Sequence, residues 1–182
     1  MFVVTGVTGR TGAVAAQALI DAGVAVRVVV RDRAKAARWA EQGAEVAVAD
    51  LADSAALTRA FAGACGTYLV KPPNYALENL FEHADVTARA VAEAVRAAGL
   101  PKLVLLSSVG ADRPSGTGVI ATNRTAEQRL AELGIPVVFP RPAYFMANWA
   151  PLVHPVRRQG IPPTLPVPVE RATPLVATED TG

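Results

Sequence analysis

The stretch Thr5-Gly6-Val7-Thr8-Gly9-Arg10-Thr11-Gly12 decides the fold. It follows a short β-branched run, residues 2–5, that is typical of a buried strand, and it opens a run, residues 10–22, with Ala and Leu at helical spacing. Gly6 permits a tight turn, Gly9 lets the backbone approach a diphosphate, and Gly12 lets the helix pack close to the strand. The free amide groups and positive dipole end of that helix then face the phosphates. Because strand, glycines and helix agree, the turn predicts a dinucleotide site.

Beyond this turn, strand-like and helix-like segments alternate along the chain. Runs of β-branched and aliphatic residues predict strands at 24–30, 45–49, 67–70, 102–106 and 135–139. Helical spacing predicts helices after Asp32, after Asp53 or Ser54, at 80–98 and at 119–133. Strands that alternate with helices and are apolar on both faces predict an α/β fold, a doubly wound parallel sheet of the Rossmann type with helices on both faces.

The chain changes character after Pro140. Residues 1–140 are expected to form the NAD(P)-binding domain, whereas prolines from Pro142 to Pro174 interrupt any long regular element beyond it. Residues 141–182 are therefore predicted to be an irregular, incomplete substrate-side segment packed on the same domain. One short helix is expected near residues 144–149.

Composition and charge exclude several classes of protein. The net charge of +2 is too small for a nucleic-acid surface, and no apolar run reaches the roughly 20 residues that span a bilayer. The single cysteine, Cys65, excludes an internal disulfide and is expected to be buried and inert. His83, His154, Cys65 and the carboxylates form no spacing typical of a metal site. We expect a cytoplasmic protein without nucleic-acid, membrane or metal partners, one that could form a homo-oligomer through its apolar tail.

Arg31 carries the prediction of cofactor preference. It follows the second predicted strand, about 20 residues beyond the turn, where NAD-binding proteins carry an acidic residue for the ribose hydroxyls. A planar guanidinium suits a 2′-phosphate instead, and Arg10, Arg33 and Lys35 could extend the positive patch. The alternative is that Arg31 is a solvated strand-end residue and Asp32 takes the place of the acid. The pattern favours NADP(H) over NAD(H).

Other candidate cofactor contacts follow the later strands. Asp50 and Leu51 are placed to touch the adenine, although Asp50 could equally cap a helix. Lys71 follows the fourth strand and could hydrogen-bond the nicotinamide ribose. Ser107 follows the fifth strand and could orient a substrate or only close the strand end. The full set of predicted cofactor residues is Gly6, Thr8, Gly9, Arg10, Thr11, Gly12, Arg31, Asp50, Leu51, Lys71, Pro72, Pro73, Ser107 and Arg124.

With these residues in view, the chain resembles the NmrA-like branch of the atypical short-chain dehydrogenases. The resemblance covers nearly the whole chain and includes the glycine turn, Val30-Arg31-Asp32, and residues 43–51, 103–111, 127–130, 134–136 and 176–182. Its most specific stretch is Arg141-Pro142-Ala143-Tyr144-Phe145-Met146-Ala147-Asn148-Trp149. The family has an NADP-binding Rossmann domain; some members reduce quinones, and others act as NADP-sensing regulators. The resemblance implies the same for this chain.

The chain departs from the family pattern in two ways. Family members continue well past the segment that 176–182 resembles, and they build much of the substrate pocket there, so the pocket is expected to be open on one side. Dehydrogenases of the wider superfamily also place a Lys four residues after a Tyr, where it lowers the phenol pKa, and no tyrosine of this chain has such a Lys. On the helix where this pair would lie, Arg124 could take over ribose contacts and Asn123 could polarise a carbonyl.

Tyr144 is a third candidate for a catalytic role, beside Asn123 and Arg124. With Phe145 and Trp149 it forms an aromatic group expected near the nicotinamide end of the cleft. These rings could stack on a flat substrate, or they could only plug the edge of the sheet.

Two functions therefore remain open for the sequence. The first is an NADPH-dependent oxidoreductase that acts on a quinone-like or other small carbonyl or aromatic acceptor, mainly by positioning donor and acceptor. The second is a non-catalytic protein in which NADP(H) shifts a conformational or assembly equilibrium. The missing Tyr/Lys pair favours the second, and the intact cofactor and Phe-Met-x-Asn segments favour the first. We expect the first.

Overall fold

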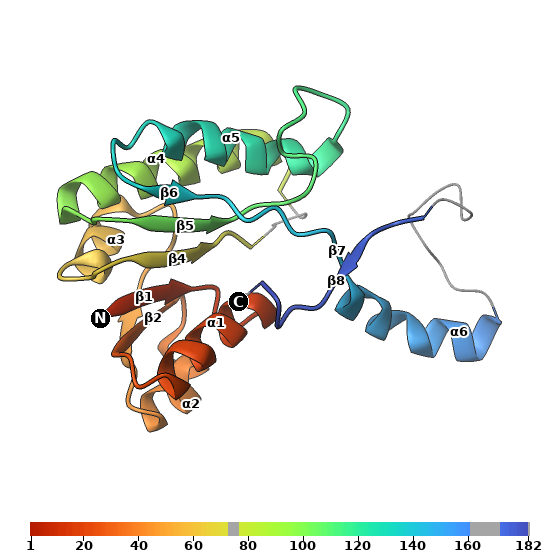
Figure 1. Cartoon of the computed structure of the whole chain (residues 1–182), viewed down its shortest axis with the longest axis horizontal. Coiled ribbons are helices and arrows are strands. Elements are labelled where there is room, and N and C mark those ends of the chain that lie inside the picture. Colours follow the sequence, from red (N-terminus) through yellow and green to blue (C-terminus); the bar gives the residue numbers. More distant parts are fainter. Residues whose placement is uncertain (73–76, 161–171, 182) are drawn as a thin grey trace.

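A six-stranded parallel sheet forms the centre of the molecule (Figure 1). The computed structural model describes residues 1–72, 77–160 and 172–181. Their strands lie in the order β3-β2-β1-β4-β5-β6, so the strand order reverses between β1 and β4. Ligands of such sheets bind at this switch point, outside the carboxyl ends of the strands. The strands are β1 (Phe2–Thr5), β2 (Val26–Val30), β3 (Glu45–Val48), β4 (Thr67–Val70), β5 (Leu103–Leu106) and β6 (Val137–Val138).

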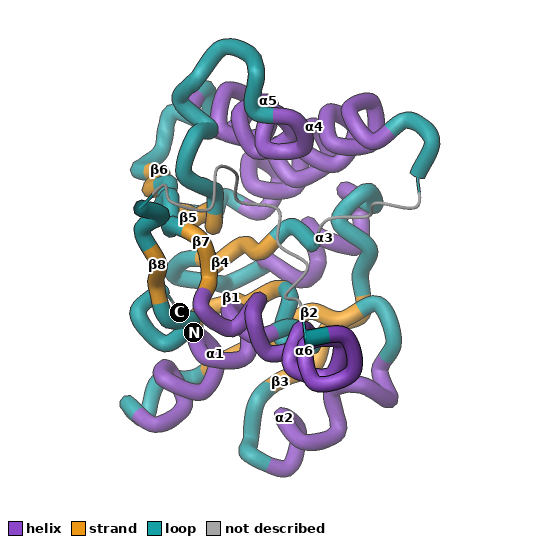
Figure 2. Tube along the Cα trace, turned by 90° about the vertical axis from the view of Figure 1, so that its right-hand side faces the viewer, coloured by secondary structure: helices purple, strands orange, loops and turns teal. Residues whose placement is uncertain are grey.

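Helices cover both faces of the sheet, which confirms the doubly wound fold (Figures 1 and 2). On one face lie α1 (Arg10–Asp21) and α2 (Ala37–Glu41); on the other lie α3 (Ser54–Phe61), α4 (Leu80–Ala98) and α5 (Ala121–Ala131). Successive side chains of a strand point to opposite faces. Val3 therefore joins the α3–α4 core with Phe61, while Val4 joins the α1–α2 core with Trp39.

The predicted elements are present, and they differ from the prediction mainly at their ends. Asp32 caps a short 3-10 helix, η1 (Arg33–Ala36), and Asp53 caps α3, each through its carboxylate. The predicted helix at 119–133 begins with a 3-10 turn, η2 (Gly118–Ile120), before α5. The last strand, β6, is much shorter than 135–139, because Pro136 and Pro140 flank it and cannot donate to a ladder.

The C-terminal segment holds more regular structure than its prolines predict. The short helix expected near 144–149 is present as a 3-10 helix, η3 (Met146–Leu152), but it starts two residues later, because β7 (Tyr144–Phe145) pairs in parallel with β8 (Leu175–Val176), and a second helix, α6 (Val153–Gln159), follows it. Pro155 is tolerated because it lies in the first turn of α6, where an N–H has no partner within the helix. In Figure 1, α6 projects away from the sheet.

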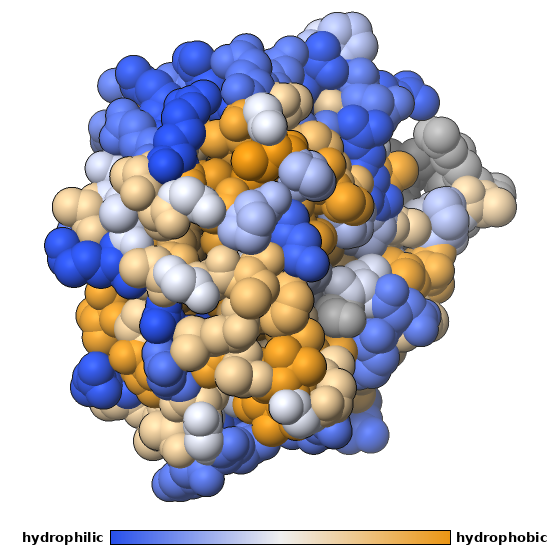
Figure 3. All heavy atoms as spheres, turned by 60° about the vertical axis from the view of Figure 1, so that its left-hand side comes forward, coloured by the Kyte–Doolittle hydropathy of each residue, from blue (hydrophilic) through white to orange (hydrophobic). Residues whose placement is uncertain are grey.

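One part of the sheet lacks a helical cover. On the α1 side, no described helix lies over β5 and β6 (Figure 1), and a groove of about 500 Å³ lies there between α1 and the sheet. Phe2, Leu19, Tyr68, Val104 and Val138 are among its lining residues. Figure 3, turned toward the side where the strands begin, shows apolar residues across the middle of that face. Burial raises the pKa of Tyr68 to about 12, and its hydroxyl donates to the carbonyl of Thr181.

Cys65 does not behave as the sequence predicts. Its side chain is exposed rather than buried, since the turn that leads into β4 lies at the surface. The N-terminal amine of Met1 lies 3.6 Å from its Sγ atom. A core role for this thiol is thereby excluded.

Candidate nucleotide-binding site

The turn between β1 and α1 has no room for side chains at two of its glycines. Gly6 adopts a φ of +68°, and a methyl group there would lie 2.7 Å from Cβ of Val70. A methyl group at Gly12 would lie 2.5 Å from the carbonyl oxygens of both Thr5 and Gly6. Gly6 therefore makes the turn possible, and Gly12 lets α1 approach the end of β1.

The N-terminus of α1 is suited to an anion. Its N-cap is Gly9, which offers no side-chain acceptor, and the first turn contains no acidic residue. The first amide N–H groups of a helix have no partner within it, and the helix dipole places partial positive charge there. The turn that leads to them lines the cleft with Gly6, Thr8 and Gly9. These groups fit the diphosphate of a dinucleotide.

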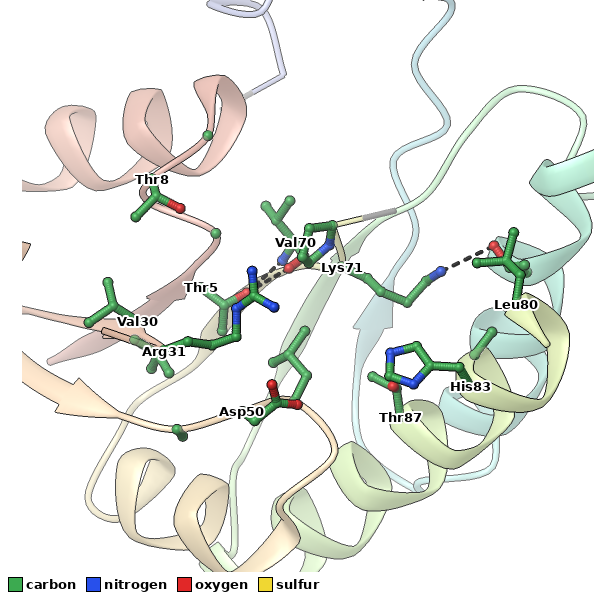
Figure 4. Close-up of a pocket in the computed structure, with 18 of the residues that line it drawn as sticks. Thr5, Thr8, Val30, Arg31, Asp50, Val70, Lys71, Leu80, His83 and Thr87 are labelled. Atoms are coloured by element: carbon green, nitrogen blue, oxygen red, sulfur yellow. Dashed lines mark hydrogen bonds between the residues drawn. The ribbon is translucent and has the colours of Figure 1, made fainter. Parts of the chain in front are cut away.

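The cleft itself encloses about 500 Å³ at the carboxyl ends of β1 to β4 (Figure 4). A hydroxyl clamp joins the two strands at the switch point: Thr5 Oγ1 donates to the carbonyl of Val70 at 3.0 Å and accepts from the Val70 amide at 2.8 Å. The lining residues come from six strands and helices and from the loops beside them. They are Thr5, Gly6, Thr8, Gly9, Val29, Val30, Arg31, Ala49, Asp50, Leu51, Val70, Lys71, Pro72, Leu80, His83, Ala84, Thr87, Val119 and Thr122.

Arg31 lies at the rim of this cleft with its guanidinium exposed. Among the residues that the structure describes, it makes no hydrogen bond or ion pair. Asp32, the alternative ribose ligand, instead accepts from the amide of Ala34 at 3.0 Å. Arg33 donates to the carbonyl of Val46 at 3.3 Å and so lies toward β3.

A second group of cations lies beside the glycine turn, in a pocket that shares Thr8 and Gly9 with the cleft. Arg10, Lys35 and Arg38 line a shallow pocket there together with Thr8 and Gly9. The guanidinium of Arg10 donates to the carbonyl of Ala147 at 2.8 Å and so connects the turn to η3. Of the predicted patch, Arg31 therefore lines the cleft, whereas Arg10 and Lys35 line this neighbouring pocket.

Lys71 extends from the end of β4 across the cleft toward α5 (Figure 4). Its ammonium donates to Thr122 Oγ1 at 3.1 Å, and burial lowers the pKa of Lys71 below its ordinary value. Asp50 lines the opposite part of the cleft, and its carboxylate accepts from the amide of Ala52 at 2.9 Å. Leu51 and Pro72 line the cleft as well.

Several predicted cofactor residues lie outside the cleft lining. Thr11 and Gly12 are buried in the first turn of α1, and Pro73 lies outside the described residues. Arg124 donates to the carbonyl of Asp112 at 2.9 Å. Asn123 beside it is half-buried, and Tyr144 lies in β7 with its ring edge-on to Trp149, at 6.2 Å between centroids.

Ser107 belongs to a buried polar cluster instead. Its hydroxyl donates to Oε1 of Glu127 at 2.5 Å, and Arg141 donates to the same carboxylate at 2.9 and 2.5 Å. Burial by itself would raise the pKa of Glu127, but the hydrogen bonds from Arg141 and Ser107 and the charge of Arg141 hold it below its ordinary value. This cluster connects the end of β5, α5 and the segment that follows β6.

The wall formed by α4 was not predicted from the sequence. Leu80, His83, Ala84 and Thr87 all line the cleft. Their spacing of three or four residues places them on one face of the helix, and this spacing was the available signal.

The described residues hold neither a candidate metal site nor a helix that could span a membrane. No group of three or more His, Cys, Asp and Glu side chains in this part of the chain could hold a metal ion. None of the described helices is both long enough and apolar enough to cross a membrane.

The chain is similar to reductases. It is 35% identical, over 155 residues, to the (4-alkanoyl-5-oxo-2,5-dihydrofuran-3-yl)methyl phosphate reductase of Streptomyces griseus subsp. griseus, covering 83% of this chain and 51% of that protein. It is 31% identical, over 151 residues, to quinone oxidoreductase 2 of Escherichia coli (strain K12), covering 82% and 50%. The crystal structure of the NADPH-dependent quinone oxidoreductase from E. coli complexed with NADPH superposes with a TM-score of 0.75 at 28% identity, covering 88% of this chain and 55% of that one.

These comparisons agree with the fold and with the sequence resemblance. The chain spans about half the length of the curated relatives it matches. A sequence profile of the NmrA-like family matches residues 1–182, the full extent of the chain. The chain therefore belongs to the NmrA-like family.

Proposed function

We propose that this protein binds NADP(H) and serves as a reductase of a small quinone-like, carbonyl or aromatic acceptor. The observation that carries the proposal is the uncapped N-terminus of α1, which opens behind Gly6 and Gly9 onto a cleft rimmed by a free guanidinium, that of Arg31. Diphosphate and 2′-phosphate are the ligand groups that these two features suit. The relatives named above are reductases, and one is described as complexed with NADPH, which supports the assignment.

The preference for NADP(H) over NAD(H) rests on Arg31. An acidic side chain at the end of β2 would accept from the ribose hydroxyls of NAD(H), whereas a guanidinium donates a pair of parallel hydrogen bonds to a phosphate. Asp32 is engaged as the cap of η1, so its carboxylate is less free for a ribose. The comparison with an NADPH complex is consistent with this preference.

The chain's own residues act by binding and orientation. A bound nicotinamide cofactor supplies the hydride in such reductions. The glycine turn and α1 hold the diphosphate, and the Thr5–Val70 clamp fixes the ends of β1 and β4 against each other. Lys71 is a cation at the cleft wall that donates to Thr122 Oγ1, and burial lowers its pKa below the ordinary value. A quinone-like acceptor requires little general acid help, which fits the absence of a Tyr/Lys pair.

A second function, a non-catalytic NADP(H) sensor, is favoured by one observation. Arg10 lies in the phosphate-binding turn and donates to the carbonyl of Ala147 in η3. A ligand bound at the turn could therefore change the position of the C-terminal segment through this residue. A sensor would bind NADPH without turnover.

The test of both functions combines binding with turnover. Calorimetric titration of NADPH and NADH is expected to show tighter binding of NADPH, and NADPH oxidation is expected with members of a quinone panel. Arg31→Ala should weaken NADPH binding by about 1.5–3 kcal/mol, the usual contribution of a charged hydrogen bond, and leave NADH binding nearly unchanged. Equal losses for both cofactors would contradict the role of Arg31. Binding without oxidation of any acceptor would favour the sensor, and no binding would refute both.

A further inference from the structure

The α4 wall of the cleft carries two polar side chains among apolar ones. Leu80, His83, Ala84 and Thr87 form a stripe at helical spacing that faces the cleft. His83 and Thr87 lie one turn apart, and Figure 4 shows them on the opposite side of the cleft from Arg31 and Asp50. An apolar wall with two polar groups can orient a flat ring that has a polar edge.

Thr87 has an unsatisfied hydroxyl. The residue is only 4% exposed, and its Oγ1 is closed off from solvent and has no hydrogen-bond partner among the described residues. A helical threonine ordinarily donates to a carbonyl of the preceding turn. Buried polar groups are nearly always paired, so an unpaired one at a cleft wall indicates a missing partner.

His83 is the second unpaired polar group of this wall. Its side chain is exposed, and neither ring nitrogen makes a hydrogen bond within residues 1–72, 77–160 and 172–181. Thr87 Oγ1, one turn further along α4, is closed off in this structure, so contact with a ligand requires a shift of the side chains beside it, and the exposed imidazole of His83 has room to shift. A neutral imidazole offers one donor and one acceptor, and a hydroxyl offers both.

The position of the ribose determines which ligand group reaches this wall. If the diphosphate binds at Gly6 and Gly9 and the 2′-phosphate at Arg31, the base on that same ribose faces the part of the cleft that Asp50, Leu51 and α4 line. The surfaces there are apolar and suit the two faces of a flat ring. They are formed by Val29, Ala49, Leu51, Val70 and Ala84.

We propose that Thr87 and His83 recognise the polar edge of the adenine base, so that α4 selects the base of the dinucleotide. This inference rests on the proposed binding of NADP(H) and adds the residues that read its base. The hydroxyl of Thr87 accepts from the 6-amino group or donates to N1, and the imidazole of His83 takes the adjoining position. Arg31 reads the 2′-phosphate of the same nucleotide independently of this wall.

The experiment is a double-mutant cycle in which one change is made in the protein, at Thr87, and the other in the ligand, at the edge of the adenine base. Binding of NADP⁺ and of 1,N6-etheno-NADP⁺, in which the edge of the base is blocked, is measured by calorimetry for wild type, Thr87→Val and Thr87→Ser. Thr67→Val is the matched control, because Thr67 also has a buried unpaired hydroxyl and is 3% exposed, yet it lines the groove on the α1 side. Circular dichroism and thermal unfolding establish that each variant is folded.

The expected pattern is specific to the base edge. Thr87→Val should weaken NADP⁺ binding on the order of five-fold, as for one neutral hydrogen bond, and should leave etheno-NADP⁺ binding nearly unchanged. Thr87→Ser should retain most of the affinity because it keeps the hydroxyl, and His83→Leu should repeat the Thr87→Val pattern. Adenosine 2′,5′-bisphosphate should respond as NADP⁺ does, since it carries the same base and 2′-phosphate.

Other results overturn the inference in distinguishable ways. If wild type binds NADP⁺ but Thr87→Val behaves like Thr67→Val, the base is not read by α4 and the proposed function stands. If Thr87→Val weakens both ligands equally, the residue supports the cleft without touching the base edge. If it changes the KM of an acceptor and leaves NADP⁺ affinity unchanged, the wall serves the acceptor. If wild type binds no NADP⁺, the inference and the proposed function both fail.

Discussion

Gly12→Ala offers a direct test of the close approach between α1 and β1. The added methyl group would lie 2.5 Å from the carbonyl oxygens of Thr5 and Gly6, whereas real Cβ contacts are essentially never below 3.0 Å. Both oxygens belong to the backbone, so no side chain can move aside, and α1 must shift by about 0.5 Å or more, the difference between those two distances. The start of α1 then moves away from the carboxyl end of β1.

The expected cost is that of overpacking, about 1–3 kcal/mol of the free energy of unfolding. With a denaturant slope of about 2 kcal/mol/M, the urea midpoint should fall by about 0.5–1.5 M. The fluorescence of Trp39, which is 1% exposed in the α1–α2 core, reports the transition. NADPH affinity should fall as well, because the amide groups that open α1 move from their positions.

Gly9→Ala separates stability from binding. Gly9 has a φ of −97°, which alanine adopts readily, and a methyl group there would meet only the carbonyl oxygen of Gly6, at 3.3 Å. This variant should keep the urea midpoint close to that of wild type and lose NADPH affinity, because the methyl enters the space of the diphosphate. A wild-type midpoint and wild-type affinity for Gly12→Ala would refute the packing argument.

Two further substitutions test the charged groups. Lys71→Met should raise the free energy of unfolding at neutral pH, because it removes a buried ammonium. Since burial lowers the pKa of Lys71 in the folded state, this gain should shrink as the pH rises through the folded pKa toward the unfolded pKa of about 10.4. Urea unfolding from pH 6 to 10 measures the change. Glu127→Gln should cost about 1–3 kcal/mol at pH 7 by weakening the bonds from Arg141 and Ser107. Because the pKa of Glu127 is lowered in the folded state, the substitution should have its full cost above the unfolded pKa of about 4.3, and the cost should vanish as the pH falls through the folded pKa. A cost that does not change between neutral and acidic pH would exclude the ion pair as its cause.

The sequence predicted the parts of the site that lie on continuous stretches of chain. The glycine turn, Arg31 and Asp50-Leu51 follow strands whose order is dictated by alternation of strand and helix, so their meeting at one edge of the sheet could be foreseen. The contacts of Lys71 with Thr122, and the inclusion of His83 and Thr87, depend on how α4 and α5 pack against each other. The periodicity of apolar residues in a sequence shows which face of a helix is buried, but it does not show which other helix packs against that face.

The fate of Ser107 shows the same limit. Its position after β5 correctly places it near the carboxyl edge, but its hydroxyl is taken by Glu127, twenty residues further along the chain. Likewise, the strand pair of Tyr144–Phe145 with Leu175–Val176 joins residues on either side of a proline-rich stretch, where no periodic pattern marks a strand. Such pairings arise from tertiary contacts that a single sequence does not display.

The lack of a helix over β5 and β6 on the α1 side of the sheet affects which strands unfold locally most easily. β1 and β2 are packed between two helical layers, whereas β6 is an edge strand of two residues whose Val138 is 57% exposed. Amide hydrogens should therefore exchange with solvent fastest along β6 and slowest in β1, in a gradient across the sheet. The C-terminal segment is attached at the fast end, through the hydrogen bonds from Ser107 N to Pro140 O and from Val109 N to Pro142 O. Fraying of that margin would loosen the segment at this end, while its hydrogen bonds from Arg10 to Ala147 and from Tyr68 to Thr181 remained.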